Sequence, residues 1–252
     1  MLRAILAILL WAFLLIVVGI PVLLAGLVYP SRTVGAFGTR VWAKAMLWVC
    51  GVRLSVCGAD AVTDGTPRFF IGNHQSALDI PIVLAALHGD VRFMAKKSLF
   101  FIPIFGWIIA RYGYVAIDRS SARVTVADIN RALERARRNP VSFAVFPEGT
   151  RSRDGRLGSF RMGTVKICQR WGFPVVPFSI RGAIDVAHRD RMFAVRPGSV
   201  RLTFGQPIPA EEAAQMSPVE LHDRIRAVIL SHLNDRGREA ELAEPALARS
   251  SV

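Results

Sequence analysis

The stretch Asn73-His74-Gln75-Ser76-Ala77-Leu78-Asp79 follows the short apolar run Arg68-Phe69-Phe70-Ile71-Gly72 and precedes an apolar segment from Ile80 to His88. The run before it is rich in β-formers and ends in glycine, which is typical of a buried strand. The segment after it is typical of a helix. The seven residues therefore join the C-terminal end of a strand to a helix, where sheets flanked by helices tend to place their active sites.

His74 and Asp79 give this connection a candidate chemistry. An imidazole titrates near neutrality and can accept a proton from a hydroxyl group. A carboxylate on its other ring nitrogen fixes the tautomer and stabilises the imidazolium as it forms. Two structural alternatives remain open, because Ser76 and Asp79 also fit an S-x-x-D helix cap, and a single histidine at a strand end is more often structural.

Composition indicates a single large domain that works beside a membrane. The 252 residues carry a formal net charge of +13, and 52% of them are hydrophobic. A basic chain suits nucleic acid or an anionic membrane surface, and the apolar excess favours the membrane over nucleic acid. The three cysteines have no metal-ligand spacing and fit reduced thiols in a cytosolic domain.

The N-terminal region predicts a membrane anchor. No charged residue occurs from Ala4 to Tyr29, a run that would extend about 39 Å as a helix, although Pro21 interrupts it. The run is too long for a signal peptide, so we expect it to be retained, and whether it spans the bilayer or dips into it stays open. Basic residues follow the run while only Arg3 precedes it. If the run spans the bilayer, this charge distribution predicts that the rest of the chain lies in the cytosol, on an inner or cytoplasmic membrane.

Three regions follow from this interpretation. Residues 1–52 form N-terminal anchoring helices, the second of which carries Trp, Lys and Arg and suits the bilayer interface. Residues 53–236 form the catalytic α/β domain, and residues 237–252 form a mobile tail.

Alternation of apolar strands and amphipathic helices predicts an α/β sandwich. Besides the strand over 68–72, we expect strands over 53–58, at the sheet edge, and over 91–95, 113–119, 141–146, 173–180 and 200–204. We expect a helix over 123–138, and a second one that the segment from Phe160 to Thr164 leads into and that ends at Trp171. A third helix is expected from Ser217-Pro218 to Asn234, with Ser217 as N-cap. The apolar segment from Leu99 to Ala110 is either a buried helix, or else a wall of the acyl-chain site or a membrane-facing patch.

Charged residues follow two further strands. Arg119 ends one strand, and the next is followed by the loop Pro147-Glu148-Gly149-Thr150-Arg151-Ser152. Because an arginine fork binds phosphate in a bidentate manner, Arg119 and Arg151 are candidate phosphate ligands, although each alone is more often a surface charge. No Walker A, GxGxxG, GxSxG or HExxH pattern is present, so nucleotide-driven and serine-hydrolase chemistry have no support.

The ordered motifs resemble those of the glycerolipid acyltransferases, the family that includes 1-acylglycerol-3-phosphate acyltransferases. The matching segments, which run in order from about Val52 to Gly205, are Asn73 to Asp79, Lys96-Lys97-Ser98-Leu99 with Pro103-x-x-Gly106-Trp107, Gly113-x-x-x-Ile117-Asp118-Arg119, Phe146 to Ser152 and Val175-Val176-Pro177. Ser98 stands where an acidic residue is more usual. The resemblance implies an α/β fold with a central mixed sheet flanked by helices.

The resemblance also implies an activity. An acyl group would pass from acyl-CoA or acyl-carrier protein to the free hydroxyl of 1-acyl-glycerol-3-phosphate, forming phosphatidate for phospholipid biosynthesis, with no cofactor and no metal. His74 would be the general base and Asp79 would orient it. Arg119, Arg151 and Lys96 would hold the acceptor phosphate, and the Glu148-Gly149-Thr150 segment would complete the substrate site, with Glu148 positioning an arginine or an acceptor hydroxyl.

Two alternatives remain at this point. Within the family, the acceptor could be a lyso-ornithine lipid, a lysophospholipid or glycerol-3-phosphate. Outside it, the chain could be a basic membrane-bound protein that only binds lipid. Binding alone would not need His74 and Asp79 together with Glu148 and Arg151, so we favour an enzyme.

Overall fold

The computed structural model describes residues 9, 11–28, 32–62, 64–87, 89–117, 129–132, 134–135, 141–188, 190 and 195–234. Arg119, most of the helix expected over 123–138 and the tail expected over 237–252 lie outside the described residues.

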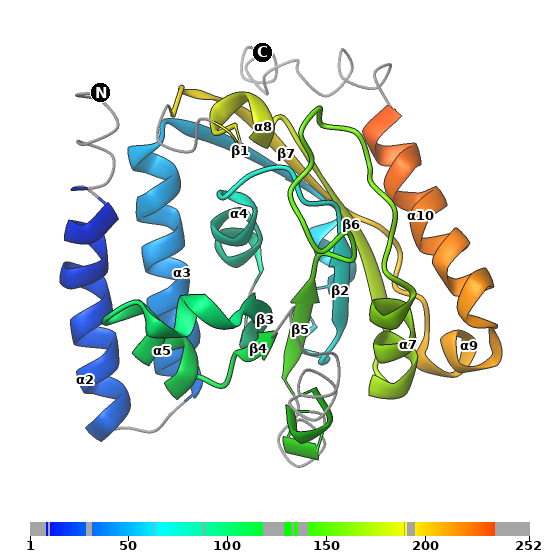
Figure 1. The fold of residues 1–252 in the computed structure, drawn as a ribbon, viewed down its shortest axis with the longest axis horizontal. Coiled ribbons are helices and arrows are strands. Elements are labelled where there is room, and N and C mark those ends of the chain that lie inside the picture. The colour runs from blue at the N-terminus through cyan, green and yellow to red at the C-terminus, as the bar shows by residue number, and fades with distance from the viewer. Residues whose placement is uncertain are drawn as a thin grey trace, which may run out of the picture.

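A seven-stranded sheet organises the molecule (Figure 1). Its strand order is β1-β7-β6-β2-β5-β3-β4, and every neighbouring pair is parallel except the antiparallel pair β6 and β7. This confirms the mixed sheet of an α/β fold, with the first strand at one edge as expected. The strands are β1 (Val52–Cys57), β2 (Phe69–Gly72), β3 (Val91–Lys96), β4 (Val115–Ile117), β5 (Ser142–Val145), β6 (Val175–Arg181) and β7 (Gly198–Phe204).

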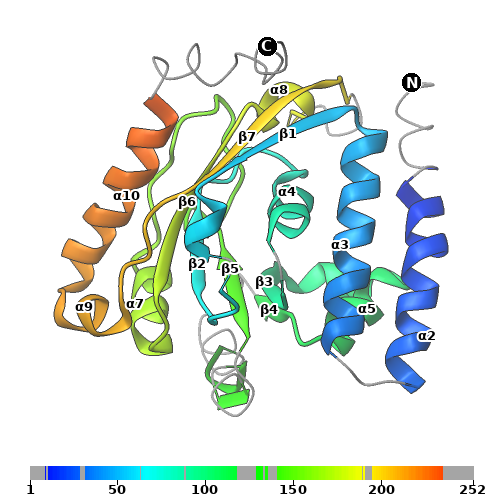
Figure 2. The same cartoon turned by 180° about the vertical axis from the view of Figure 1, so that it is seen from behind.

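Helices cover both faces of this sheet (Figures 1 and 2). One face carries α3 (Arg32–Val49) and α4 (Asp79–Ala86), and the other carries α7 (Met162–Trp171), α9 (Ala210–Gln215) and α10 (Pro218–Asn234). Successive residues of the central strand β2 serve the two cores, since Phe70 belongs to the first and Phe69 and Ile71 to the second. The short helices η2 (Ala59–Val62) and α8 (Ala183–Val186) lie in connections between strands.

The register of the central strands brings two loops together. Ile71 of β2 pairs with Val145 of the parallel strand β5, so His74 and Glu148 each follow three residues beyond a paired position. Parallel strands end at the same edge of a sheet, and both residues therefore leave the sheet side by side. Gly72 permits the neighbouring strand to pack closely, because a Cβ there would lie 2.3 Å from the ring of Phe178.

The N-terminal apolar run is divided into a π-helical turn, η1 (Leu15–Gly19), and α2 (Ile20–Val28). Pro21 lacks the N–H that would bond to the carbonyl of Val17, which accounts for the departure from regular α-helix at this point. None of the helices in the described part of the chain combines the length and the apolar character needed to cross a bilayer.

Helix α5 (Phe105–Arg111) fixes the N-terminal helices to the rest of the protein. The Tyr112 hydroxyl donates to the Val22 carbonyl at 2.9 Å, and Arg111 donates to the Gly26 carbonyl at 2.7 Å. The residue four positions after Gly26 is Pro30, which has no N–H, so Arg111 supplies the donor that the helix itself lacks. A glycine at position 35 leaves room for the ring of Tyr112.

The segment from Leu99 to Ala110 is buried on one side and exposed on the other. It forms η3 (Lys97–Phe101) and α5, joined by a turn in which Ile104 has φ 64° and Phe105 N–H donates to the Pro103 carbonyl at 2.7 Å. Ile108 and Ile109 are buried, whereas Phe101 and Trp107 are 75% and 58% exposed. The segment therefore packs inward on one side and presents aromatic rings to the exterior on the other.

Candidate active site

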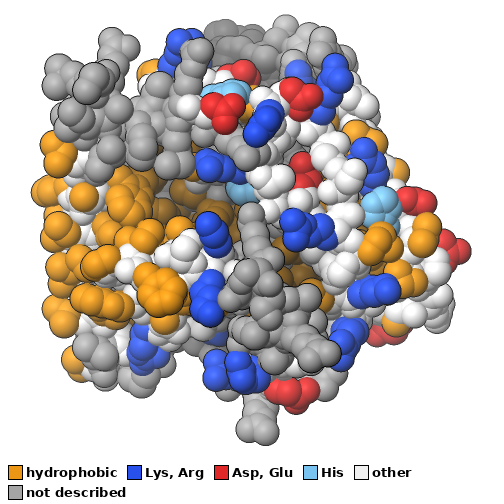
Figure 3. Space-filling view, in the orientation of Figure 1, with side chains coloured by type: hydrophobic (Ala, Val, Ile, Leu, Met, Phe, Trp, Pro, Cys, Tyr) orange, Lys and Arg blue, Asp and Glu red, His pale blue; other side chains and the backbone are white. Residues whose placement is uncertain are grey.

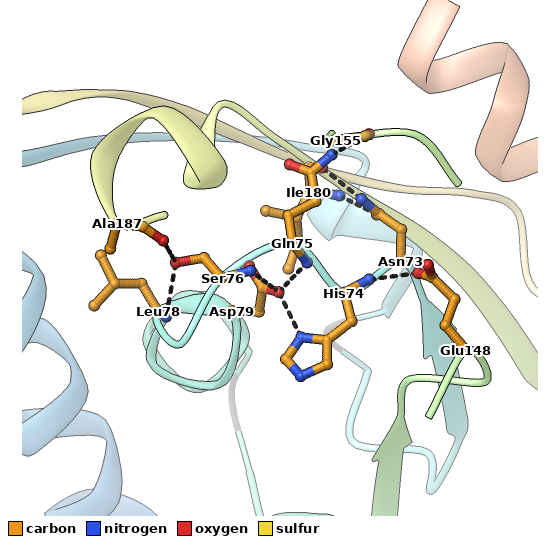
Figure 4. A network of polar contacts seen from close by, with 10 residues as sticks. All are labelled: Asn73, His74, Gln75, Ser76, Leu78, Asp79, Glu148, Gly155, Ile180 and Ala187. Atoms are coloured by element: carbon orange, nitrogen blue, oxygen red, sulfur yellow. Dashed lines mark hydrogen bonds and ion pairs between the residues drawn. The ribbon is translucent and has the colours of Figure 1, made fainter. Parts of the chain in front are cut away.

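His74 and Asp79 are in contact at the C-terminal end of β2 (Figure 4). Asp79 Oδ2 lies 2.7 Å from His74 Nδ1, and the Asp79 side chain is fully buried. No described residue bonds to Nε2 of His74, which points away from the network in Figure 4. A carboxylate on Nδ1 favours the tautomer whose Nε2 is an acceptor, and that tautomer can take up a proton.

Asp79 also organises the turn that precedes its own helix, α4. Its Oδ2 accepts the backbone N–H groups of Gln75 and Ser76 at 2.6 and 2.8 Å. The oxygen that contacts the imidazole therefore also fixes the turn before α4. The helix cap suggested by the S-x-x-D pattern is not formed as expected, because α4 begins at Asp79 and its N-cap residue, Leu78, has no side-chain cap hydrogen bond. Its second oxygen, Oδ1, is buried without a hydrogen-bond partner among the described residues.

Phe146 supports the imidazole from one side. Its ring stacks on that of His74 with centroids 4.2 Å apart and an angle of 9° between the planes. Phe146 follows β5 directly, so the register that aligns His74 with Glu148 also places this ring. The imidazole is thus held by a carboxylate at its edge and by an aromatic ring at its face.

Glu148 holds the backbone on both sides of the site. Its Oε1 accepts the N–H of His74 at 2.8 Å, and its Oε2 accepts the N–H of Gly158 at 2.9 Å. Burial raises the pKa of Glu148 above its ordinary value, although the two N–H groups act in the opposite direction. The sequence suggested that Glu148 positions an arginine or a substrate hydroxyl, and the structure adds these two backbone contacts.

Three further side chains hold the His74 loop. Sequence reasoning assigned no role to Asn73 or Gln75, and for Ser76 it considered only a helix cap. Asn73 exchanges two hydrogen bonds with the backbone of Ile180, at 2.8 and 2.7 Å. Ser76 Oγ donates to the carbonyl of Ala187 at 2.8 Å, and Gln75 Nε2 donates to the carbonyl of Gly155 at 2.9 Å. The partners lie 80 to 111 residues away in the chain, so local patterns carried no signal for them.

The charged loop after β5 borders a cavity of about 360 Å³. Its lining includes three arginines, Arg151, Arg153 and Arg156, against two carboxylates, those of Glu148 and Asp154, so the cavity is slightly basic. Gly149 has φ 68°, a conformation that glycine adopts without strain, and this bends the loop back after Glu148. The Ser152 N–H donates to the His74 carbonyl at 2.7 Å, which joins this loop directly to the His74 loop.

Lys96 is exposed at the end of β3, which pairs with β5 on one side and with β4 on the other. In the sequence, Arg119 follows two residues after the end of β4. The structure thus brings His74, Asp79, Glu148 and the Arg151 loop together and places Lys96 at the same sheet edge. The described residues contain no group of three or more His, Cys, Asp or Glu side chains that could hold a metal ion.

Comparison with known proteins gives consistent matches. A family model described as acyltransferase matches residues 53–181. Over 178 residues the chain is 32% identical to the chloroplastic 1-acyl-sn-glycerol-3-phosphate acyltransferase LPAT1 of Arabidopsis thaliana, covering 70% of this chain and 49% of that protein. It is 25% identical over 210 residues to the 1-acyl-sn-glycerol-3-phosphate acyltransferase of Pseudomonas aeruginosa, covering 79% and 78% of the two chains.

A solved structure matches nearly the whole chain. It is the crystal structure of the 1-acyl-sn-glycerophosphate acyltransferase PlsC from Thermotoga maritima, with a TM-score of 0.78, 27% identity, and coverage of 97% of this chain and 98% of that one. The chain spans about half the length of the first two curated relatives it matches.

Proposed function

Because this chain belongs to the acyltransferase family, we propose that it transfers an acyl group from a thioester donor to the free hydroxyl of 1-acyl-glycerol-3-phosphate and so forms phosphatidate. The donor is acyl-CoA or acyl-carrier protein. The observation that carries the proposal is the contact between His74 Nδ1 and the buried carboxylate of Asp79, which leaves Nε2 for a substrate.

The geometry accounts for the chemistry in two steps. In the first, His74 Nε2 accepts the proton of the acceptor hydroxyl while its oxygen attacks the thioester carbon and forms a tetrahedral oxyanion. Asp79 stabilises the imidazolium that results. In the second, the oxyanion collapses, the carbon–sulfur bond breaks, and the imidazolium returns the proton to the leaving thiolate. The acyl group passes directly to the acceptor, so the enzyme forms no covalent intermediate.

The acceptor phosphate needs cationic ligands within reach of His74. Arg151 lines the basic cavity and lies in the loop that bonds to the His74 backbone. We assign Arg151 to the phosphate together with Arg119 and Lys96, and Thr150 and Gly149 to the turn that presents it. Glu148 keeps the loop and the catalytic histidine in one frame through its two backbone contacts.

The N-terminal helices suit attachment to a membrane surface that faces the cytosol. Apolar side chains gather on the side of the molecule formed by α2 and α5, whereas most Lys and Arg side chains in this view lie nearer its middle and on its opposite side (Figure 3). On α3, Phe37, Val41 and Trp48 follow helical spacing and are 70%, 39% and 82% exposed. Exposure of these apolar side chains to water is unfavourable, whereas the bilayer interface offers them an apolar environment. In this proposal, attachment through these helices brings the protein to the membrane that supplies its acceptor lipid.

The proposal is tested by incubating the purified full-length protein with acyl-CoA or acyl-carrier protein and a panel of lyso-acceptors. We expect phosphatidate from 1-acyl-glycerol-3-phosphate, with kcat/KM higher than for lysophosphatidylcholine, lyso-ornithine lipid or glycerol-3-phosphate. Preference for another acceptor would reassign the substrate within the family. Lipid binding without any acyl transfer would overturn the proposal.

A further inference from the structure

We propose that Gln75 is a positioning residue, which holds the arginine-bearing loop of residues 151–155 in register with His74. The acceptor's phosphate and its reacting hydroxyl are then bound a fixed distance apart. This inference deepens the proposed function and rests on it for its kinetic consequences.

The contact that carries the inference is long-range and buried. Gln75 is only 4% exposed, and its Nε2 donates to the carbonyl of Gly155, 80 residues further along the chain, at 2.9 Å. A carbonyl oxygen only accepts hydrogen bonds, so the amide must present its NH₂ group to this partner. Figure 4 shows the side chain pointing to Gly155 while the backbone of the same residue faces Asp79.

Gln75 therefore connects two sites with one residue. Its backbone N–H belongs to the turn that Asp79 organises, and its side chain belongs to the loop that carries Arg151 and Arg153. The Ser152 N–H, bonded to the His74 carbonyl at 2.7 Å, is the second connection between these loops. A separate, exposed contact joins His188 Nε2, which lies after α8, to the carbonyl of Arg153 at 3.1 Å. Of the two connections described between the loops, only that of Gln75 is made by a buried side chain.

The details of the contact indicate that Gln75 serves the site more than the stability of the fold. Its Oε1 is buried with no hydrogen-bond partner among the described residues, which carries a desolvation cost. An apolar side chain of similar shape removes that cost. Gly155 is half-buried, so its carbonyl can bond to water when Gln75 is replaced. Gln75→Met should consequently fold.

Positioning matters here because the acceptor is held at two points. His74 needs the hydroxyl within hydrogen-bond reach, and Arg151 needs the phosphate of the same molecule. A misplacement of about 1 Å between such points can lower a rate about a hundredfold. An arginine fork adds a directional requirement that a loosely held loop does not meet.

The kinetic test compares Gln75→Met with Gln169→Met as a matched control. Gln169 Nε2 also donates to backbone carbonyls, those of Ala213 and Met216 at 3.0 and 2.9 Å, but between α7 and the α9 region. We expect Gln75→Met to raise the KM for 1-acyl-glycerol-3-phosphate about tenfold and to leave the KM for the donor unchanged. The control should change neither. An unchanged acceptor KM in Gln75→Met, or an equal rise for both substrates, would overturn the inference.

A second variant tests the hydrogen bond itself. Gln75→Glu keeps the length of the side chain, but an ionised carboxylate has no proton to donate to Gly155, whereas a protonated one does. His74, Asp79 and Glu148, the other ionisable groups in the network, occur in both proteins. The ratio of kcat/KM in Gln75→Glu to that in wild type should therefore rise as the pH is lowered from about 8 to about 6, because burial raises carboxyl pKa values. A ratio that does not change with pH would contradict the assigned bond.

Limited proteolysis tests the connection without any catalytic assay. Arg153 and Arg156 are exposed in the loop, and trypsin cleaves after arginine. Gln75→Met should be cut there several times faster than wild type or Gln169→Met, since loop opening precedes cleavage. Equal cutting rates would refute the connection. If wild type failed to acylate 1-acyl-glycerol-3-phosphate, the proposed function would fall, and the cutting rates would still decide whether Gln75 holds the loop.

Discussion

At Glu148, burial raises the pKa of the carboxyl group while hydrogen bonds from the backbone of His74 and Gly158 lower it. Burial raises its pKa, so the native protein keeps the proton to a higher pH than the unfolded chain does. The contribution of this group to the free energy of unfolding is then complete below the unfolded pKa of about 4.3 and is lost as the pH rises through the higher native pKa.

Glu148→Gln removes this titration. The free energy of unfolding of wild type minus that of Glu148→Gln should therefore fall as the pH is raised from about 4 toward neutrality, measured by denaturant titration at each pH. Glu220→Gln is a control of opposite sign, because hydrogen bonds from Ser217 lower the pKa of Glu220. Its difference should rise over the acidic part of the range. A Glu148 difference that also rose would refute the assignment.

Individual residues also show how far the sequence could be used for prediction. Ser217 was expected as an N-cap, and its Oγ accepts the Glu220 N–H at 3.2 Å while Glu220 accepts the Ser217 N–H at 2.7 Å. That contact spans three residues, within reach of a local pattern. The bonds between Asn73 and Ile180 span 107 residues and depend on the order of β6 and β2 in the sheet, which hydrophobic patterns do not specify.

At the scale of secondary-structure elements, α3 can pack against Tyr112, the residue after α5, because position 35 is a glycine. A Cβ at Gly35 would lie 2.2 Å from ring carbons of Tyr112, whose hydroxyl is already bonded to Val22. The sequence identified Pro21 as an interruption of an apolar run. The structure shows that glycines in α2 and α3 also make room for a tyrosine of the catalytic domain, a function that periodicity cannot indicate.

Two glycine-to-alanine substitutions should therefore have opposite effects. Gly35→Ala should lower the free energy of unfolding by about 1–3 kcal/mol, because overpacking exceeds the gain in helix propensity. In Gly163→Ala, on α7, the new methyl group meets no atom within 4 Å, and stability should rise by about 0.5 kcal/mol. Denaturant titration in mild detergent measures both. A stabilising Gly35→Ala would contradict the packing of Tyr112 between these helices.

At the scale of the whole molecule, an apolar end and a basic body suggest two additive forces toward a membrane. Burial of apolar rings is independent of salt, whereas attraction of Lys and Arg to anionic lipid is about 1 kcal/mol per residue and is screened by salt. The exposed rings of α3, η3 and α5 belong to the first class. The sequence predicted the attachment and offered the segment from Leu99 to Ala110 as one that could face the membrane, but it could not indicate that α5 is bonded to α2 at the same end of the molecule.

Vesicle binding tests this arrangement. The double variant Phe37→Asp, Trp48→Asp should bind vesicles at least about tenfold more weakly than wild type, because each ring loses roughly 1.5–3 kcal/mol of burial. Val219→Asp is the matched control, since Val219 is an exposed apolar residue on α10, 59% exposed. High salt should not release the full-length wild type from vesicles. Release by salt alone, or equal weakening in the control, would refute membrane attachment through this surface.

The central claim is that His74, oriented by Asp79, is the general base of an acyl transfer, and one assay tests it most directly. Phosphatidate formation from a thioester and 1-acyl-glycerol-3-phosphate is measured for wild type, His74→Ala and His222→Ala. His222 is a suitable control because it also has a carboxylate, that of Asp223, 2.7 Å from its Nδ1, but on α10. We predict that His74→Ala lowers kcat by at least about a hundredfold with the fold intact, and that His222→Ala retains wild-type turnover. Turnover of His74→Ala within a few-fold of wild type would contradict the claim.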